Sequence, residues 1–108
     1  MAKTIYTLRY LPLFYEDLEE KAMYIAKQLN NPHAANDLID SVESSILDRL
    51  SIAESFEQYH SHRERLYPYY RIYVKNYVIY YVVINDHDNK IMEIRRFLHN
   101  KQCRESLI

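Results

Sequence analysis

The sequence predicts an α+β fold in which an antiparallel helix hairpin packs on one face of a mainly antiparallel four-stranded sheet, in the order β-α-α-β-β-β. Two long segments of the first half have apolar residues at helical spacing, and only a short break separates them. The second half contains runs of Tyr, Val and Ile, which are typical of strands. The chain has 108 residues, enough for one hydrophobic core, so we expect a single domain over residues 1–108.

The first strand and the first helix are separated by a proline. Residues 3–10 alternate weakly between polar and apolar side chains, which indicates a strand. Pro12 ends this strand and suits the first turn of a helix. We expect the helix from Leu13 to Leu29, with Asn30 in a left-handed conformation at its end. The apolar stripe of this helix contains Phe14, Leu18, Ala22, Ile25, Ala26 and Leu29.

A second helix begins directly after the first. Asn31 is a good N-cap and Pro32 suits the first helical position, so the pair marks a new helix start. The helix is expected to reach about Ala53. Because the connection is short, the two helices should form an antiparallel hairpin. The apolar stripe of the second helix contains Ala35, Leu38, Ile39, Val42, Ile46 and Leu50.

Three strands follow. The segments 69–74 and 77–84 are expected to form a β-hairpin around a two-residue turn at Lys75-Asn76. Residues 77–84 are apolar at nearly every position, which predicts a central strand that is covered on both faces. Residues 90–97 form the last predicted strand, whereas residues 55–66 have no clear period.

A two-residue turn would pair Arg71 with Tyr80 and would divide the hairpin into two faces. The uncharged face should carry the helices, and the face with Arg71 should be open. The predicted helix-covered face contains Tyr70, Ile72, Val74, Tyr77, Ile79, Tyr81 and Val83. The predicted open face contains Tyr69, Arg71, Tyr73, Val78, Tyr80, Val82 and Ile84.

The composition adds two expectations. Gly is absent, so turns that need a positive φ should use Asn or Asp, at Asn30, at Lys75-Asn76 and within residues 85–89. Residues 1–60 carry five Lys and Arg against ten Asp and Glu, a net charge of −5, whereas residues 61–108 carry nine against five, a net charge of +4. The basic sheet half favours an anionic partner such as RNA, although charged helix surfaces and sheet rims are also common.

Several classes of function are disfavoured. The longest apolar run has eight residues, which is too short to span a membrane, and the N-terminus has no signal-peptide pattern. The single Cys103 cannot form an internal disulfide, and no Cys and His residues have zinc spacing. We therefore expect a cytoplasmic protein with no metal and no cofactor.

A set of short motifs covers nearly the whole chain in order. The set comprises Leu11-Pro12, Asp17-Leu18, Tyr24-Ile25, Ala34-Ala35, Tyr70-Arg71, Asn76-Tyr77, Tyr80-Tyr81 and Arg96-Phe97-Leu98-His99. Taken together, these motifs resemble the RelE/ParE toxin superfamily of type II toxin–antitoxin systems, often labelled plasmid stabilisation proteins. The resemblance implies the fold derived above and an antitoxin protein as partner. It also implies that operator DNA is bound only through the toxin–antitoxin complex.

The resemblance implies two different activities. RelE-like members cut messenger RNA on the ribosome without a metal, whereas ParE-like members poison DNA gyrase and are not nucleases. Metal-free RNA cleavage needs a base, an acid and cations that stabilise the phosphate. Arg71 matches a phosphate-stabilising arginine of the nucleases, or it braces a loop. Arg96 matches the arginine of the last strand. By alternation it shares the face of Met92 and Ile94, where it reaches water and phosphate or forms a salt bridge to the helices.

Further residues are candidates for proton transfer. His99 lies close to the position of a histidine in some nuclease members, but ParE-like members also have a histidine at this position. Asn100 follows His99 where the nuclease members have a catalytic tyrosine. Tyr80 or Tyr77 could replace that tyrosine only if it reaches the cleft. Glu64 could act as a base, although a solvated charge cluster with its arginine neighbours is the alternative.

The predicted function is the toxin of a type II toxin–antitoxin system. Between mechanisms, the basic sheet half favours a ribosome-dependent mRNA endonuclease. The alternatives are a ParE-like inhibitor of DNA gyrase without nuclease activity, and an inactive relative that only binds the antitoxin.

Overall fold

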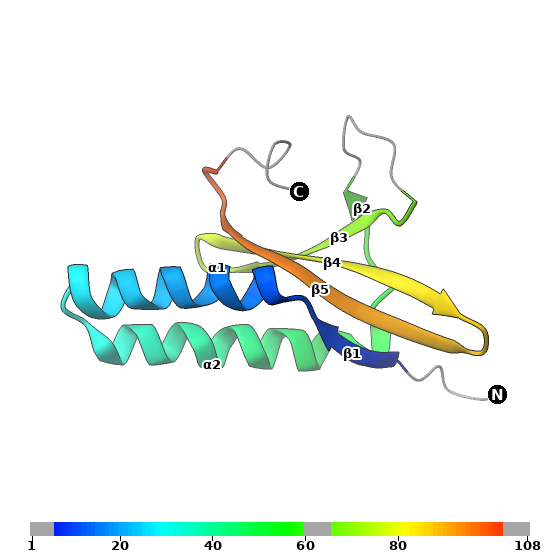
Figure 1. The fold of residues 1–108 in the computed structure, drawn as a ribbon, viewed down its shortest axis with the longest axis horizontal. Helices are drawn as coiled ribbons and strands as arrows, with labels where there is room; N and C mark the ends of the chain where they lie inside the picture. The colour runs from blue at the N-terminus through cyan, green and yellow to red at the C-terminus, as the bar shows by residue number, and fades with distance from the viewer. Residues whose placement is uncertain (1–5, 60–65, 103–108) are drawn as a thin grey trace.

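Two antiparallel helices cover one face of a β-sheet in the computed structural model of this chain, which describes residues 6–59 and 66–102 (Figure 1). The helical layer consists of α1 (Pro12–Met23), the π-helix η1 (Tyr24–Gln28), α2 (Pro32–Arg49) and the 3-10 helix η2 (Leu50–Ile52). The sheet consists of β1 (Tyr6–Tyr10), β2 (Gln58–Tyr59), β3 (Tyr69–Val74), β4 (Tyr77–Asp86) and β5 (Asn89–His99). The predicted fold class is confirmed.

The strands formed by the described residues follow the order β1-β5-β4-β3-β2. The apolar strand β4 is central, as predicted. β1 is parallel to β5, and the other neighbours are antiparallel. The four predicted strands are present, and β2 adds a fifth. Because β2 has only two residues, it leaves no periodic pattern that the sequence could reveal.

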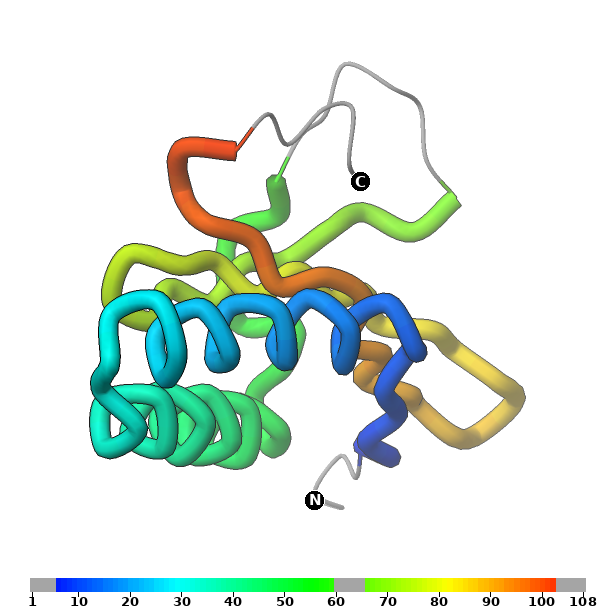
Figure 2. Tube along the Cα trace, turned by 60° about the vertical axis from the view of Figure 1, so that its left-hand side comes forward, coloured from blue at the N-terminus to red at the C-terminus, as the bar shows by residue number. Residues whose placement is uncertain are grey.

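The helix hairpin is built as the sequence indicates, and α1 and α2 lie side by side in a second view (Figure 2). Asn30 has a φ of 49°, and the side chain of Asn31 accepts a hydrogen bond of 3.1 Å from the Ala34 N–H. The regular α-helix ends at Met23 rather than at Leu29, because the chain widens into η1. Apolar spacing does not distinguish this wider turn from an α-helical one.

The β3–β4 hairpin has the predicted two-residue turn, which pairs Arg71 with Tyr80. The prediction that Asn or Asp would supply the positive φ angles was only partly correct. Asn30 does so, but the other two such residues in the described segments are Lys75 (φ 54°) and His87 (φ 57°). Lys75 shows that a two-residue turn can impose a left-handed conformation on an unfavourable residue.

The two faces of the sheet divide as predicted, but the face opposite the helices is only partly open. The helix-covered face forms the main core, which includes Phe14, Leu38, Val42, Ile46, Tyr70, Ile72, Ile79, Tyr81, Met92, Ile94 and Phe97. On the opposite face Val78, Tyr80 and Val82 are fully buried. The partly buried side chains of Tyr59 and Tyr67 pack against this second cluster. The expectation of an open face was therefore wrong for Val78, Tyr80 and Val82, because Tyr59 of β2 and Tyr67 pack against their cluster, whereas Tyr73 on the same face remains exposed.

Candidate functional site

Three of the predicted site residues lie in one row across the sheet. Arg71 in β3 pairs with Tyr80 in β4, and Tyr80 pairs with Arg96 in β5. Neighbouring strands lie about 4.8 Å apart, so the backbones of the two arginines are roughly 10 Å apart. The row is a property of the register, and the side chains of its three members have very different surroundings.

Arg71 is a partly exposed cation between aromatic rings. Its guanidinium carbon lies 5.0 Å from the centre of the Tyr59 ring and 5.8 Å from the centre of the Tyr73 ring. Tyr73 is 62% exposed, so the cluster reaches solvent. Among residues 6–59 and 66–102, no carboxylate lies within salt-bridge distance of this guanidinium. Arg71 therefore has the means to bind an anionic group.

Tyr80 lies beneath this surface rather than on it. Its ring is fully buried and makes edge-to-face contacts with the rings of Tyr59 and Tyr69, at centroid distances of 5.9 and 6.0 Å. A buried phenol of this kind packs as a core aromatic. The condition stated for Tyr80, that it reach a cleft, is not met in this structure.

Strand β5 has a β-bulge at Arg95. Tyr80 pairs with Arg96 but Tyr81 pairs with Ile94, so Arg95 is the extra residue. The bulge moves Phe97 into the helix-covered core, a position that strict alternation would have given to residue 96. The predicted shared face of Arg96, Met92 and Ile94 is therefore wrong.

Arg96 is bound by a carboxylate from α1. Its Nε donates to Asp17 Oδ2 at 2.7 Å and its terminal nitrogen donates to Asp17 Oδ1 at 2.9 Å. The Phe97 N–H also donates to Asp17, at 3.0 Å. This hydrogen-bonded pair raises the pKa of Arg96 despite burial, and the arginine side chain is only 16% exposed. Of the two alternatives for Arg96, the salt bridge to the helices is the one found.

A second buried carboxylate was missed by the sequence analysis. Glu93 is only 4% exposed and accepts hydrogen bonds from Arg9 in β1 and from Arg95, the latter at 2.8 Å. Burial opposes ionisation of Glu93, but the two arginines outweigh it and lower its pKa. The guanidinium of Arg95 also lies 5.8 Å from the Tyr69 ring centre. A Glu inside an apolar strand with arginines nearby was the available signal.

His99 lies on the other side of the sheet from Arg71. It pairs with Tyr77, and the two rings meet edge to face at 5.3 Å. Tyr77 packs against the helix-covered core, whereas Arg71 lies on the face that carries the Tyr80 cluster. His99 Nδ1 accepts a hydrogen bond of 3.1 Å from the Lys101 N–H. The fifth predicted site residue, Glu64, lies outside the described residues.

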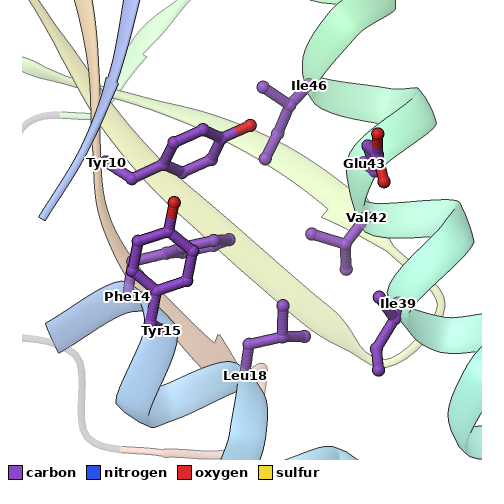
Figure 3. A pocket seen from close by; sticks show the side chains of 8 residues that line it. All are labelled: Tyr10, Phe14, Tyr15, Leu18, Ile39, Val42, Glu43 and Ile46. Carbon is purple, nitrogen blue, oxygen red and sulfur yellow. The ribbon is translucent and has the colours of Figure 1, made fainter. Parts of the chain in front are cut away.

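An apolar groove of about 270 Å³ lies between the two helices. Side chains of β1 and α1 face those of α2 across it (Figure 3). The lining residues are Tyr10, Phe14, Tyr15, Leu18, Ile39, Val42, Glu43 and Ile46. Because only Glu43 carries a charge, the groove suits apolar contacts rather than acid–base chemistry.

The described segments contain neither a metal-binding cluster nor a membrane-spanning helix. Within residues 6–59 and 66–102, no group of three His, Cys, Asp or Glu side chains is placed to hold a metal ion. No helix in those ranges is both long enough and apolar enough to cross a membrane.

Comparison with protein families identifies the chain. Residues 8–103 match the family described as the ParE toxin of the type II toxin–antitoxin system, parDE. The chain belongs to the ParE toxin family. No curated protein sequence matches it closely enough to be counted. As a member of this family, the chain is the toxin of a type II toxin–antitoxin system, and its partner is an antitoxin.

Proposed function

We propose that this ParE-family toxin arrests growth by binding DNA gyrase and not by cleaving messenger RNA. The observation that carries the proposal is the separation of Arg71 and His99 on opposite faces of the sheet. A single phosphate must touch its cation, its base and its acid at the same time, within hydrogen-bond reach. These two side chains cannot meet that condition across a packed sheet.

The state of Arg96 supports the same proposal. Both oxygens of Asp17 occupy its guanidinium, so a phosphate would have to displace a buried carboxylate that also accepts the Phe97 N–H. Breaking a buried pair leaves an uncompensated charge, which is strongly unfavourable. Arg96 therefore acts as a structural link between α1 and β5.

The surface of the helix hairpin supports binding to a protein. Large apolar side chains are exposed on both helices, and two of them, Tyr15 and Ile39, line the apolar groove of Figure 3. Exposed apolar patches beyond those of an ordinary monomer mark interaction sites. The exposed residues on α1 and α2 are Leu13, Tyr15, Met23, Ile39 and Leu47. The proposal assigns this hairpin surface to gyrase, in the cytoplasm.

The complex with the antitoxin is proposed to silence the toxin and to repress its own operator, with the DNA contacts made through the antitoxin. The charge of residues 1–60, which contain both helices, supports this division, because their net charge of −5 repels phosphate. The toxin alone should therefore bind operator DNA far more weakly than the complex does.

The test is a pair of reactions with the purified chain. In the first, gyrase, supercoiled plasmid and ATP are present, and linear DNA released by detergent and protease is measured. In the second, ribosomes with a defined messenger RNA are present, and cleavage is measured by primer extension. The proposal predicts DNA breaks in the first reaction and no cut in the second. A codon-specific cut with unaffected gyrase would overturn it.

One observation favours mRNA cleavage as a second candidate. Arg71 is stacked beside the exposed ring of Tyr73, and a cation beside aromatic rings can hold a phosphate and stack on a base. In that case the proton-transfer groups would be others than His99. Arg71→Ala would then abolish the ribosomal cut, whereas under the gyrase proposal this variant stays toxic.

A further inference from the structure

A second cavity lies at the end of the sheet opposite the β4–β5 turn. It has a volume of about 280 Å³ and shares no residue with the helix groove. In both Figure 1 and Figure 2, the β3–β4 turn and the end of β5 lie beside α1 at this end of the molecule. The lining residues are Glu20, Lys21, Tyr24, Tyr77, His99 and Gln102.

Lys21 is a buried cation with few acceptors. Its side chain is only 10% exposed, and the nearest carboxylate oxygen, on Glu20, is 3.6 Å from its Nζ, beyond hydrogen-bond distance. The Glu20 side chain is itself 76% exposed, and adjacent residues of a helix do not face each other. Within the described residues Lys21 Nζ has no other charged partner and donates no hydrogen bond. The Lys21 ammonium group can therefore pair with an anion that enters the cavity.

His99 and Gln102 are held so that each keeps a donor. His99 Nδ1 accepts from the Lys101 N–H, which assigns the ring proton to Nε2. The side-chain oxygen of Gln102 accepts from the His99 N–H at 2.6 Å, which leaves the Gln102 amide nitrogen with two hydrogens to donate. In both side chains the acceptor atom is thus engaged in a local hydrogen bond. The His99 Nε2–H and the Gln102 amide N–H groups can still donate to a ligand.

Two tyrosines, Tyr24 and Tyr77, line the cavity with their rings and offer hydroxyl groups to a ligand. Tyr77 stacks on Phe97 at 5.0 Å and meets the His99 ring edge to face, so its ring is fixed. Burial, together with the neighbouring Tyr24, raises the pKa of the Tyr77 phenol, which therefore remains a hydrogen-bond donor at neutral pH. Tyr24, in η1, is 54% exposed and stands at the opening.

We propose that this cavity binds an oxyanion, a carboxylate or a phosphate group, with Lys21 as its charged partner and with His99 and Gln102 as hydrogen-bond donors. The lining offers five groups that can donate and only one carboxylate, which points to solvent. The volume is several times that of one water molecule, so it admits the anion and part of the group that carries it. The inference does not depend on gyrase being the target.

The oxyanion can come from two sources, an acidic side chain of a partner protein or a free phosphate-bearing small molecule. Purified, isotope-labelled chain is titrated at constant ionic strength with sodium phosphate, with N-acetyl-glutamate amide, and with sodium chloride. NMR signals of the Lys21 side chain, the His99 ring and the Gln102 amide are followed. We expect saturable shifts with phosphate or with the glutamate compound, and none with chloride. The tighter of the two ligands identifies the source.

Matched variants decide the role of Lys21. Lys21→Met should weaken the binding at least about tenfold, which corresponds to the loss of one charge-assisted contact. Lys27→Met removes an exposed lysine of η1, the π-helix that directly follows α1, and should leave the affinity unchanged. If Lys21→Met fails to fold, Gln102→Leu serves as the second variant and should weaken binding about threefold or more. Absence of saturable shifts in the unaltered chain, or equal affinity of Lys21→Met, would overturn the proposal.

Discussion

Arg96 and Asp17 meet as a two-pronged pair, with nitrogen–oxygen distances of 2.7 and 2.9 Å, although 79 positions separate them in the chain. The pair links the first helix, α1, to the last strand, β5, and so connects segments near the two ends of the chain. Because Asp17 also accepts the Phe97 N–H, it fixes the backbone directly after the bulge.

Removing the guanidinium of this pair should destabilise the protein. Arg96→Ala leaves the Asp17 carboxylate buried without its counter-charge, and we expect a loss of about 2–4 kcal/mol in the free energy of unfolding. Arg71→Ala, which removes a partly exposed cation–π contact, should cost about 1 kcal/mol or less. Urea unfolding followed by circular dichroism measures both. Equal losses in the two variants would contradict the structural assignment of Arg96.

The helix hairpin should carry the toxicity. Leu47→Glu places a charge on an exposed apolar position of α2, so it should preserve the fold and weaken target binding about tenfold or more. Ser44→Glu adds the same charge to an exposed polar position of the same helix and is the control. Colony counts after induction without the antitoxin report the effect. Full toxicity of Leu47→Glu would exclude this part of the hairpin from the binding surface.

Arg71 should be dispensable for growth arrest. Arg71→Ala and Arg71→Lys are both expected to arrest growth as fully as the unaltered chain, because the gyrase proposal assigns no chemistry to this side chain. Immunoblots must confirm equal protein levels. Harmless Arg71→Ala combined with toxic Arg71→Lys would mean that the positive charge acts on the target, which favours RNA as the substrate.

Stability should fall in acid partly through Glu93. Its pKa in the folded protein lies below the ordinary value of 4.5, so its contribution is present above that pH and is lost as the pH falls through the lower, folded value. Glu93→Gln should lower the unfolding free energy at pH 7 by about 1–3 kcal/mol. It should also lose less stability between pH 7 and pH 3 than the unaltered chain. Parallel acid profiles for the two proteins would contradict this role.

Local sequence signals were sufficient for most of the fold. Asn31 and Pro32 marked a helix start because capping is a property of neighbouring residues, and the Lys75-Asn76 turn fixed the register of Arg71 against Tyr80 for the same reason. The bulge at Arg95 could not be predicted in this way. It depends on how Tyr80 and Tyr81 pair with the next strand, and it changes which side chains face the helices.

The site was harder to predict than the fold because it depends on contacts between distant segments. Alternation along one strand could not show that Asp17 would take Arg96, or that Tyr59 would cover Tyr80. The sequence did contain one signal for Asp17, because it lies three positions after Phe14 and therefore on the buried side of α1. A carboxylate on an apolar helix stripe calls for a cationic partner.

The most direct test of the gyrase proposal is a pulse-labelling experiment in bacteria that produce this chain without its antitoxin. One culture receives labelled thymidine and a second receives labelled methionine, and incorporation is followed in the first minutes after induction. The account predicts that thymidine incorporation falls first, because poisoned gyrase halts replication before translation is affected. If methionine incorporation falls first while thymidine incorporation continues, the chain acts on translation and the gyrase proposal is wrong.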